Sequence, residues 1–416
     1  MIIRRDIHLN RLKNRMHNGM IKVITGIRGS GKSFLLRTLF REYLLCSGVS
    51  GDHIVSVDLE SPGNSALRDP DALLRYIDSH MKPRGMNYIL LDGIQLVPEF
   101  EDVLNSYAGK PNADVYVTGR SASRLSWNVI TEFRGRGDEI RVATLSFSEF
   151  CSVRDGSRDE LLREYITYGG LPEVVLKKDA GEKEEFLKDF AGTFLRDIRE
   201  RYGIRKEGAI EELINVLARS SGSFTNPRRL ADALRRAGRG AITEDTVKSY
   251  IDILQDSFLI EKSRRYDIKG RHCLGTPSKY YFSDTGFCSA MTGFRQSEFP
   301  RLMKNVICNE LRLRGLSVDA GEVGFTETVD NGRRRRSSLE VDFVCNQGYR
   351  RYYIQSAYAL PVRAKMDQEM SSLLKISDGF RKFIISGQPT PMYQNDDGIM
   401  IMNIWDFLMN PESLSF

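Results

Sequence analysis

The chain has 416 residues, of which 41% are hydrophobic and 28% charged, a composition typical of globular proteins with a buried core. No apolar run approaches the roughly 18 residues that span a bilayer, and no signal-peptide pattern follows the first residues, so we expect no membrane partner. Its formal charge of +6 arises from 61 basic and 55 acidic residues, which permits a polyanionic partner without requiring one. Six scattered cysteines without a Cys-x-x-Cys pair indicate reduced thiols, and we expect a cytoplasmic protein.

The first 150 residues alternate short apolar strands with amphipathic helices. We predict the strands at residues 21–25, 54–57, 88–91, 115–118 and 140–143. Near-continuous apolar strands between helices are typical of a parallel sheet that is covered on both faces. The pattern therefore predicts an α/β fold with a doubly wound parallel sheet.

A glycine-rich segment follows the first predicted strand and opens a helix. It matches the pattern G-x-x-x-x-G-K-[ST] without a gap, through Gly26, Ile27, Arg28, Gly29, Ser30, Gly31, Lys32 and Ser33. The glycines let backbone N–H groups turn toward an anion, and the helix N-terminus adds its positive dipole end. In this motif the lysine reaches the β- and γ-phosphates, and the final hydroxyl ligates Mg²⁺. The sequence therefore predicts a site for ATP with Mg²⁺.

Two later strands end in polar residues that belong near this loop. Asp92 follows four apolar residues, as in the Walker B strand, whose aspartate holds Mg²⁺. Thr118 ends the next strand, where we weigh two interpretations equally, a sensor of the γ-phosphate and a simple strand-to-loop turn.

The rest of the chain changes character twice. Residues 158–204 are helical, and helices at 209–219, 226–237 and 243–256 precede two strands, which is typical of a winged helix-turn-helix. After residue 295 we predict a helix at 301–313, a hairpin with its turn at 330–332, strands at 339–345, 351–357 and 382–386, and a helix at 365–375. We therefore expect four parts: an ATPase core at 1–157, a helical lid or linker at 158–204, a winged helix at 205–294 and an α/β domain at 295–416.

The chain resembles prokaryotic AAA-type ATPases with a C-terminal domain of unknown function. The resemblance rests on the glycine-rich loop, Leu-Leu-Asp-Gly-Ile-Gln, Tyr-Val-Thr-Gly-Arg-Ser, Leu-Ser-Phe-Ser-Glu-Phe, Tyr-Gly-Gly-Leu-Pro-Glu, Glu-Val-Asp-Phe-Val and Tyr-Ile-Gln-Ser-Ala-Tyr, in that order. It implies an AAA-like core, a winged helix and a terminal domain similar to PD-(D/E)XK nucleases.

The chain departs from this family pattern at the Walker B strand. Gly93 stands where the family usually has a glutamate that polarises the attacking water. General-base catalysis contributes roughly 10²- to 10⁴-fold, so we expect ATP binding to persist and hydrolysis to be weak. Asp58 and Glu60 are candidate substitute bases. Arg134 and Arg136 could act in trans as arginine fingers, or they could lie in a solvated loop without a special role. We favour the solvated loop.

The terminal domain departs from its pattern as well. Glu310, Asp342 and Gln355 occupy positions similar to the nuclease motif, but Gln355 replaces an acid and Ala357 stands where a lysine is expected. Because the acids hold the catalytic metal and the lysine stabilises developing charge, we favour a degenerate site.

Arginines cluster in two places that suit a nucleic-acid partner. They are Arg228, Arg229, Arg235, Arg236 and Arg239 in the predicted winged helix, and Arg333 to Arg336. These arginines could contact the phosphates of DNA, or they could form a basic face that only contacts solvent, and we weigh the two interpretations evenly. We favour an ATP-binding protein whose nucleotide state is coupled to the later domains, through which it contacts DNA or a protein. The alternatives are a DNA-associated regulator with structural ATP and a nucleotide-gated nuclease. The oligomeric state stays open.

Overall fold

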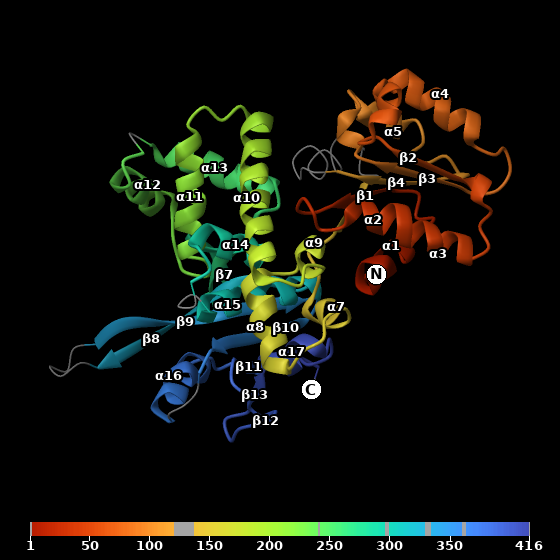
Figure 1. Cartoon of the computed structure of the whole chain (residues 1–416). Helices are drawn as coiled ribbons and strands as arrows, with labels where there is room; N and C mark the ends of the chain where they lie inside the picture. The colour runs from red at the N-terminus through yellow and green to blue at the C-terminus, as the bar shows by residue number, and fades with distance from the viewer. Residues whose placement is uncertain are drawn as a thin grey trace. The chain divides into compact units, whose positions relative to one another are not determined.

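A computed structural model describes residues 2–119, 137–239, 242–295, 299–328, 334–359 and 363–415 (Figure 1). The chain forms two compact units, one of residues 1–145 with 254–259 and one of residues 146–253 with 260–416. The sequence-based predictions at 120–121, 134, 136 and 330–333 lie outside the described residues. None of the described helices combines the length and apolar character that a bilayer crossing requires.

The first unit is built on a five-stranded parallel sheet with the order β2-β3-β4-β1-β5. The strands are β1 (Ile21–Thr25), β2 (Ile54–Asp58), β3 (Asn87–Asp92), β4 (Ala113–Thr118) and β5 (Gly137–Arg141). Each predicted strand is present, although β5 begins three residues before its predicted start. The parallel pairing confirms the predicted α/β class.

Helices cover both faces of this sheet, as Figure 1 shows. One face carries α4 (Pro70–His80) and α5 (Phe100–Asn105), packed on Ile21 and Val23 of β1. The other carries α1 (Asp6–Lys13) and a continuous helical stretch made of α2 (Lys32–Phe34), a π-helical segment (Leu35–Phe40) and α3 (Arg41–Cys46). Successive strand residues point to opposite faces, so a strand that is covered on both faces is mostly apolar. Lys22 of β1 is an exception, and its buried amino group pairs with Asp114 of β4.

Short 3₁₀ segments complete the unit at Gly51–His53, Pro62–Arg68 and Ile94–Leu96. The last of these begins directly after β3, which ends at Asp92. The chain therefore turns sharply at Gly93, whose backbone is left-handed with φ 81°.

The second unit begins with helices that include the predicted ones. They are α7 (Phe147–Cys151), α8 (Arg158–Tyr168), α9 (Pro172–Val175), α10 (Ala180–Tyr202), α11 (Glu207–Arg219), α12 (Pro227–Arg236) and α13 (Glu244–Asp256). Serine caps start α7 and α8, where Ser146 and Ser157 each accept a hydrogen bond from the backbone N–H three residues on. The three helices predicted between 209 and 256 are present within two residues.

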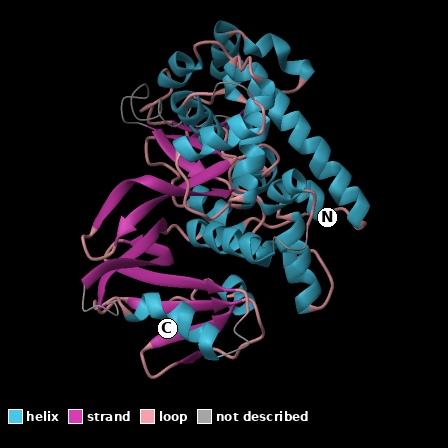
Figure 2. Ribbon diagram, turned by 90° about the vertical axis from the view of Figure 1, so that its left-hand side faces the viewer, coloured by secondary structure: helices cyan, strands magenta, loops and turns pink. Residues whose placement is uncertain are grey.

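An eight-stranded mixed sheet forms the rest of the second unit, with its strands in magenta in Figure 2. Its order is β12-β13-β11-β10-β9-β8-β6-β7. The strands are β6 (Ile260–Asp267), β7 (His272–Phe282), β8 (Ser317–Thr328), β9 (Arg334–Gln347), β10 (Arg350–Ala357), β11 (Arg381–Ser386), β12 (Tyr393–Gln394) and β13 (Ile399–Asn403). The helices that accompany the sheet are α14 (Thr285–Thr292), α15 (Phe299–Leu313), α16 (Arg363–Leu374) and α17 (Ile404–Met409).

The hairpin predicted as the wing belongs to this sheet. β6 pairs with β7 in antiparallel fashion and with β8 in parallel, so one sheet runs through residues assigned to two predicted parts. The winged helix, the nuclease-like domain and the four-part division remain predictions.

Candidate functional site

The loop from Gly26 to Ser33 leaves the C-terminal end of β1 and enters α2 (Figure 1). Gly26, Gly29 and Gly31 have positive φ angles of 139°, 78° and 90°. A Cβ atom at Gly26 would lie 2.2 Å from the carbonyl oxygen of Val142. This loop path therefore requires glycine, which is the residue without a Cβ atom.

Lys32 is buried and folds back onto the loop. Its Nζ donates hydrogen bonds to the carbonyl oxygens of Gly26 at 2.8 Å and Ile27 at 2.9 Å. The positive charge that the motif requires for phosphate is thus held within the loop.

Arg5 fixes the loop from the outside, although nothing in the sequence marks it. Its side chain is 3% exposed, and Nη1 donates to the carbonyl oxygen of Ser30 at 2.7 Å. Nη2 donates to the carbonyl oxygen of Ala143, also at 2.7 Å. One guanidinium therefore ties the loop to the segment that follows β5.

Three predicted residues meet at the C-terminal ends of neighbouring strands. The hydroxyls of Ser33 and Thr118 both donate to Oδ1 of Asp92, at 2.9 Å and 2.5 Å. The Thr118 hydroxyl accepts from the N–H of Gly93 at 2.9 Å. Ser33 and Asp92 place a hydroxyl and a carboxylate together, the oxygen ligands that suit Mg²⁺. Thr118 positions the Asp92 carboxylate from the other side.

Arg37 is a further charged group at this site that the sequence did not reveal. Its Nη1 lies 2.5 Å from Oδ2 of Asp58 and 3.6 Å from Oδ2 of Asp92. Asp58 also accepts from the backbone N–H groups of Glu60 and Ser61, at 3.0 Å and 3.2 Å. Asp58 is therefore engaged in shaping the segment after β2.

Glu60 lies beside Gly93. A Cβ atom at Gly93 would be 2.7 Å from Cγ of Glu60 and 3.5 Å from its Oε1. The Glu60 side chain thus occupies the space in which a side chain at position 93 would begin. Of the two candidate substitute bases, Glu60 is the one that lies against the family's usual glutamate position.

The nuclease-like residues are only partly brought together. Asp342 on β9 receives an ion pair from Lys304 Nζ at 2.7 Å and from Lys279 Nζ at 3.5 Å. Gln355 on β10 accepts from the Asp342 N–H at 3.0 Å and donates to Glu369 Oε2 at 2.9 Å. Amino groups thus lie beside the Asp342 carboxylate, and Gln355 supplies an amide where the nuclease pattern has an acid that holds metal.

Glu310 has a different partner. Its Oε1 lies 2.8 Å from Nε of Arg314 on the same helix, α15. Burial raises the pKa of Glu310, and Arg314 opposes that rise. The structure therefore pairs Glu310 with Arg314, whereas Asp342 is bound by Lys279 and Lys304.

The charges around Asp342 favour its ionised form. Burial alone would raise its pKa, but Lys304 and Lys279 outweigh burial and lower it below the ordinary 3.8. Lys279 is fully buried and also binds Glu340 at 2.6 Å. Lys279 and Lys304 lie far apart in sequence from Asp342, so no local pattern indicated this cluster.

The arginines of α12 and the segment after it are solvent-exposed: Arg228, Arg229, Arg235, Arg236 and Arg239. Two of them have acidic partners, since Arg235 pairs with Asp232 at 2.5 Å and Arg239 with Glu212 at 3.5 Å. Part of this basic face is thus neutralised within the chain.

Comparison with known proteins places the glycine-rich loop within an AAA domain. The model of that domain matches residues 18–151, and a domain of unknown function (DUF8612) matches residues 159–298. An uncharacterized Haemophilus influenzae protein is 31% identical over 98% of this chain and 99% of its own length. An uncharacterized Methanocaldococcus jannaschii protein is 26% identical over 86% of this chain and 78% of its own.

Among solved structures, a Walker-type ATPase of Pyrococcus abyssi superposes with a TM-score of 0.51 at 15% identity. The match covers 70% of this chain and 96% of that protein. At this identity the likeness concerns the fold alone, which is that of a P-loop ATPase.

Proposed function

Since the chain belongs to the same family as the Haemophilus influenzae protein and carries an AAA domain, we propose that it binds ATP with Mg²⁺ between Gly26 and Ser33. The observation that carries this proposal is the convergence of Lys32, Ser33 and Asp92 around a loop whose glycines have the required backbone. In this site Lys32 would exchange its loop carbonyls for phosphate oxygens.

Ser33 and Asp92 would hold the Mg²⁺ ion. Their oxygens already lie 2.9 Å apart, so a cation between them would replace a hydrogen bond rather than require a new approach of the chain. When bound, Mg²⁺ would offset the negative charge of the phosphates. Thr118 keeps the Asp92 carboxylate oriented, which supports a positioning role as well as the predicted sensor role.

Hydrolysis is slow in this proposal, because Gly93 supplies no carboxylate to polarise water. What hydrolysis remains depends on Glu60, whose side chain lies against Gly93. Asp58 is a weaker candidate because Arg37 and two backbone N–H groups already engage its oxygens.

Calorimetric titration with ATP and ADP tests the binding site. Lys32→Ala removes charge-assisted hydrogen bonds, which contribute about 1.5–3 kcal/mol each, so we expect roughly 10- to 150-fold weaker ATP binding. Lys82→Ala is the matched control, since that lysine is exposed and pairs only with exposed Asp52 among its described partners. Equal ATP affinity in the Lys32→Ala variant and the unchanged protein would contradict the proposal.

The nucleotide state is proposed to act on the second unit, which would contact DNA or another protein. The exposed arginines of α12 support a DNA partner, and a DNA-associated regulator with structural ATP stays the alternative. ATP turnover with and without DNA distinguishes the two, because only a coupled ATPase changes its rate. The Lys304–Asp342 pair argues against a nucleotide-gated nuclease. The cytoplasmic location remains a prediction.

A further inference from the structure

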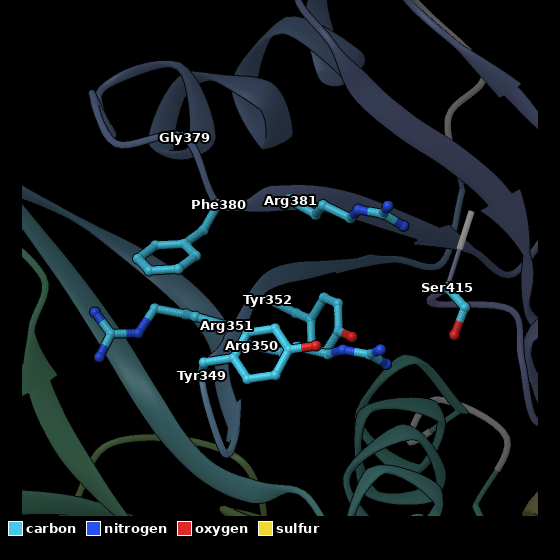
Figure 3. Close-up of a pocket in the computed structure, with 8 residues that line it drawn as sticks. All are labelled: Tyr349, Arg350, Arg351, Tyr352, Gly379, Phe380, Arg381 and Ser415. Atoms are coloured by element: carbon cyan, nitrogen blue, oxygen red, sulfur yellow. The ribbon is translucent and has the colours of Figure 1, made fainter.

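A cavity lies in the second unit, at the N-terminal ends of β10 and β11 (Figure 3). These strands are parallel neighbours in which Tyr352 pairs with Arg381, so their first residues meet at one edge. The cavity has a volume of about 360 Å³, within the size range of small-ligand pockets. Its lining consists of Tyr349, Arg350, Arg351, Tyr352, Gly379, Phe380, Arg381 and Ser415.

Two aromatic rings of this cavity are open to solvent. Tyr349, in the turn between β9 and β10, is 86% exposed, and Phe380 just before β11 is 40% exposed. Exposed aromatic rings forgo the burial that normally stabilises them, so their position beside a cavity points to a binding role.

Three arginines accompany these rings. In the described part of the chain none of Arg350, Arg351 and Arg381 forms an ion pair with a carboxylate. Arg351 donates to Asn346 Oδ1 at 2.7 Å and lies over the Phe380 ring at 5.4 Å.

Arg350 lies over the Tyr349 ring at 5.7 Å, and Arg381 donates to the carbonyl oxygen of Leu414 at 3.4 Å. Figure 3 shows both side chains extending toward Ser415, and neither contact neutralises their charge. Their charge is therefore available to an anion on that side of the cavity.

We propose that this cavity binds a nucleotide, free or within a single strand, with its base on Tyr349 or Phe380 and its phosphate on Arg350 and Arg381. Stacking on an exposed ring and contact of arginine with phosphate are the two interactions that hold single-stranded nucleic acid. An acidic peptide would use the arginines but not the ring faces. The site is separate from the loop at Gly26 and does not depend on ATP binding there.

Fluorescence anisotropy with a labelled oligothymidylate tests the site in the full chain. Base stacking contributes about 1–3 kcal/mol, so Tyr349→Ala should weaken binding roughly 5- to 150-fold. Each arginine that contacts a phosphate adds about 0.7 to the salt slope for single strands, so Arg350→Ala should reduce the slope by about that amount. Both residues are exposed, and unchanged unfolding temperatures would show that the variants fold.

Matched controls are Tyr393→Ala, a 42% exposed tyrosine on β12, and Arg163→Ala, an exposed arginine on α8. Competition by unlabelled thymidine monophosphate, lost in Tyr349→Ala, would identify a free nucleotide as a sufficient ligand. Competition by unlabelled oligothymidylate alone would identify the strand. Absence of binding by both probes would overturn the proposal, as would binding that Arg236→Ala on α12 weakens while Tyr349→Ala and Arg350→Ala do not.

Discussion

Moving a carboxylate between positions 60 and 93 tests how the proposed ATP site would hydrolyse ATP. The sequence alone presents Gly93→Glu as a simple gain of the family's usual base. The structure predicts otherwise, because Gly93 has φ 81° and its Cβ would lie 2.7 Å from Cγ of Glu60. A left-handed backbone costs a non-glycine residue about 1–2 kcal/mol, and the close contact forces Glu60 to move.

We therefore expect three different outcomes. Glu60→Gln should lower the residual hydrolysis, but by less than the roughly 10²- to 10⁴-fold that a well-placed general base contributes. Gly93→Glu alone should not accelerate it, because the new side chain competes with Glu60 for one space. The double variant Gly93→Glu with Glu60→Ala should hydrolyse ATP faster than Glu60→Ala alone, because the shorter side chain at position 60 leaves room for the new glutamate. The two substitutions should therefore be non-additive, as residues in contact usually are, by about 0.5–3 kcal/mol.

The assay is phosphate release under single-turnover conditions, with ATP affinity and urea unfolding measured on each variant. ATP affinity should stay unchanged in Glu60→Gln, because Lys32 and the loop backbone are intact. Glu42→Gln, on the exposed face of α3, is the control for loss of an acid. Acceleration by Gly93→Glu alone, together with no effect of Glu60→Gln, would refute the reasoning.

Three further predictions follow from particular contacts. Gly26→Ala should abolish ATP binding and lower the unfolding free energy, measured in urea, by about 1–3 kcal/mol, because the new Cβ would lie 2.2 Å from the Val142 carbonyl oxygen. An unchanged affinity for ATP would contradict this prediction. Asp342→Ala should cost about 1.5–3 kcal/mol, because Lys304 loses its carboxylate and buried Lys279 keeps only Glu340. Plasmid DNA should stay intact with Mg²⁺ or Mn²⁺ in both proteins, and nicking that the variant loses would instead support the nuclease. Because the pKa of Asp342 is lowered, its stabilising effect is present above 3.8 and is lost as the pH falls through its folded-state pKa, so the stability difference between the unchanged protein and Asp342→Asn should shrink in acid.

Local patterns were sufficient for much of the first unit. Apolar runs identified the strands because a strand covered on both faces is mostly apolar, although Ser56 lies in the middle of β2. The loop from Gly26 to Ser33 was readable because phosphate binding depends on consecutive backbone groups, which a short contiguous motif specifies. Asp92 was predicted to lie near the loop for a similar reason, because a residue at the end of an apolar strand is also marked by a short local pattern.

The second unit was less readable. β12 and β13 were not predicted, and the hairpin β6–β7 was separated from the sheet in which it lies. Strand pairing joins residues far apart in sequence, as in β6 with β8. The local hydrophobic periodicity of a strand does not specify which other strand pairs with it.

The sequence by itself determined that this chain has a P-loop in an α/β domain and that position 93 lacks a carboxylate. Only the tertiary structure decided that Glu60 lies against Gly93, that Arg5 contacts the glycine-rich loop and Arg37 contacts Asp92, and that Lys279 and Lys304 bind Asp342. The physical reason is the range of the interactions. A backbone nest is built from neighbours in the chain, whereas a charge or a carboxylate acts on whatever the fold brings within a few ångströms of it.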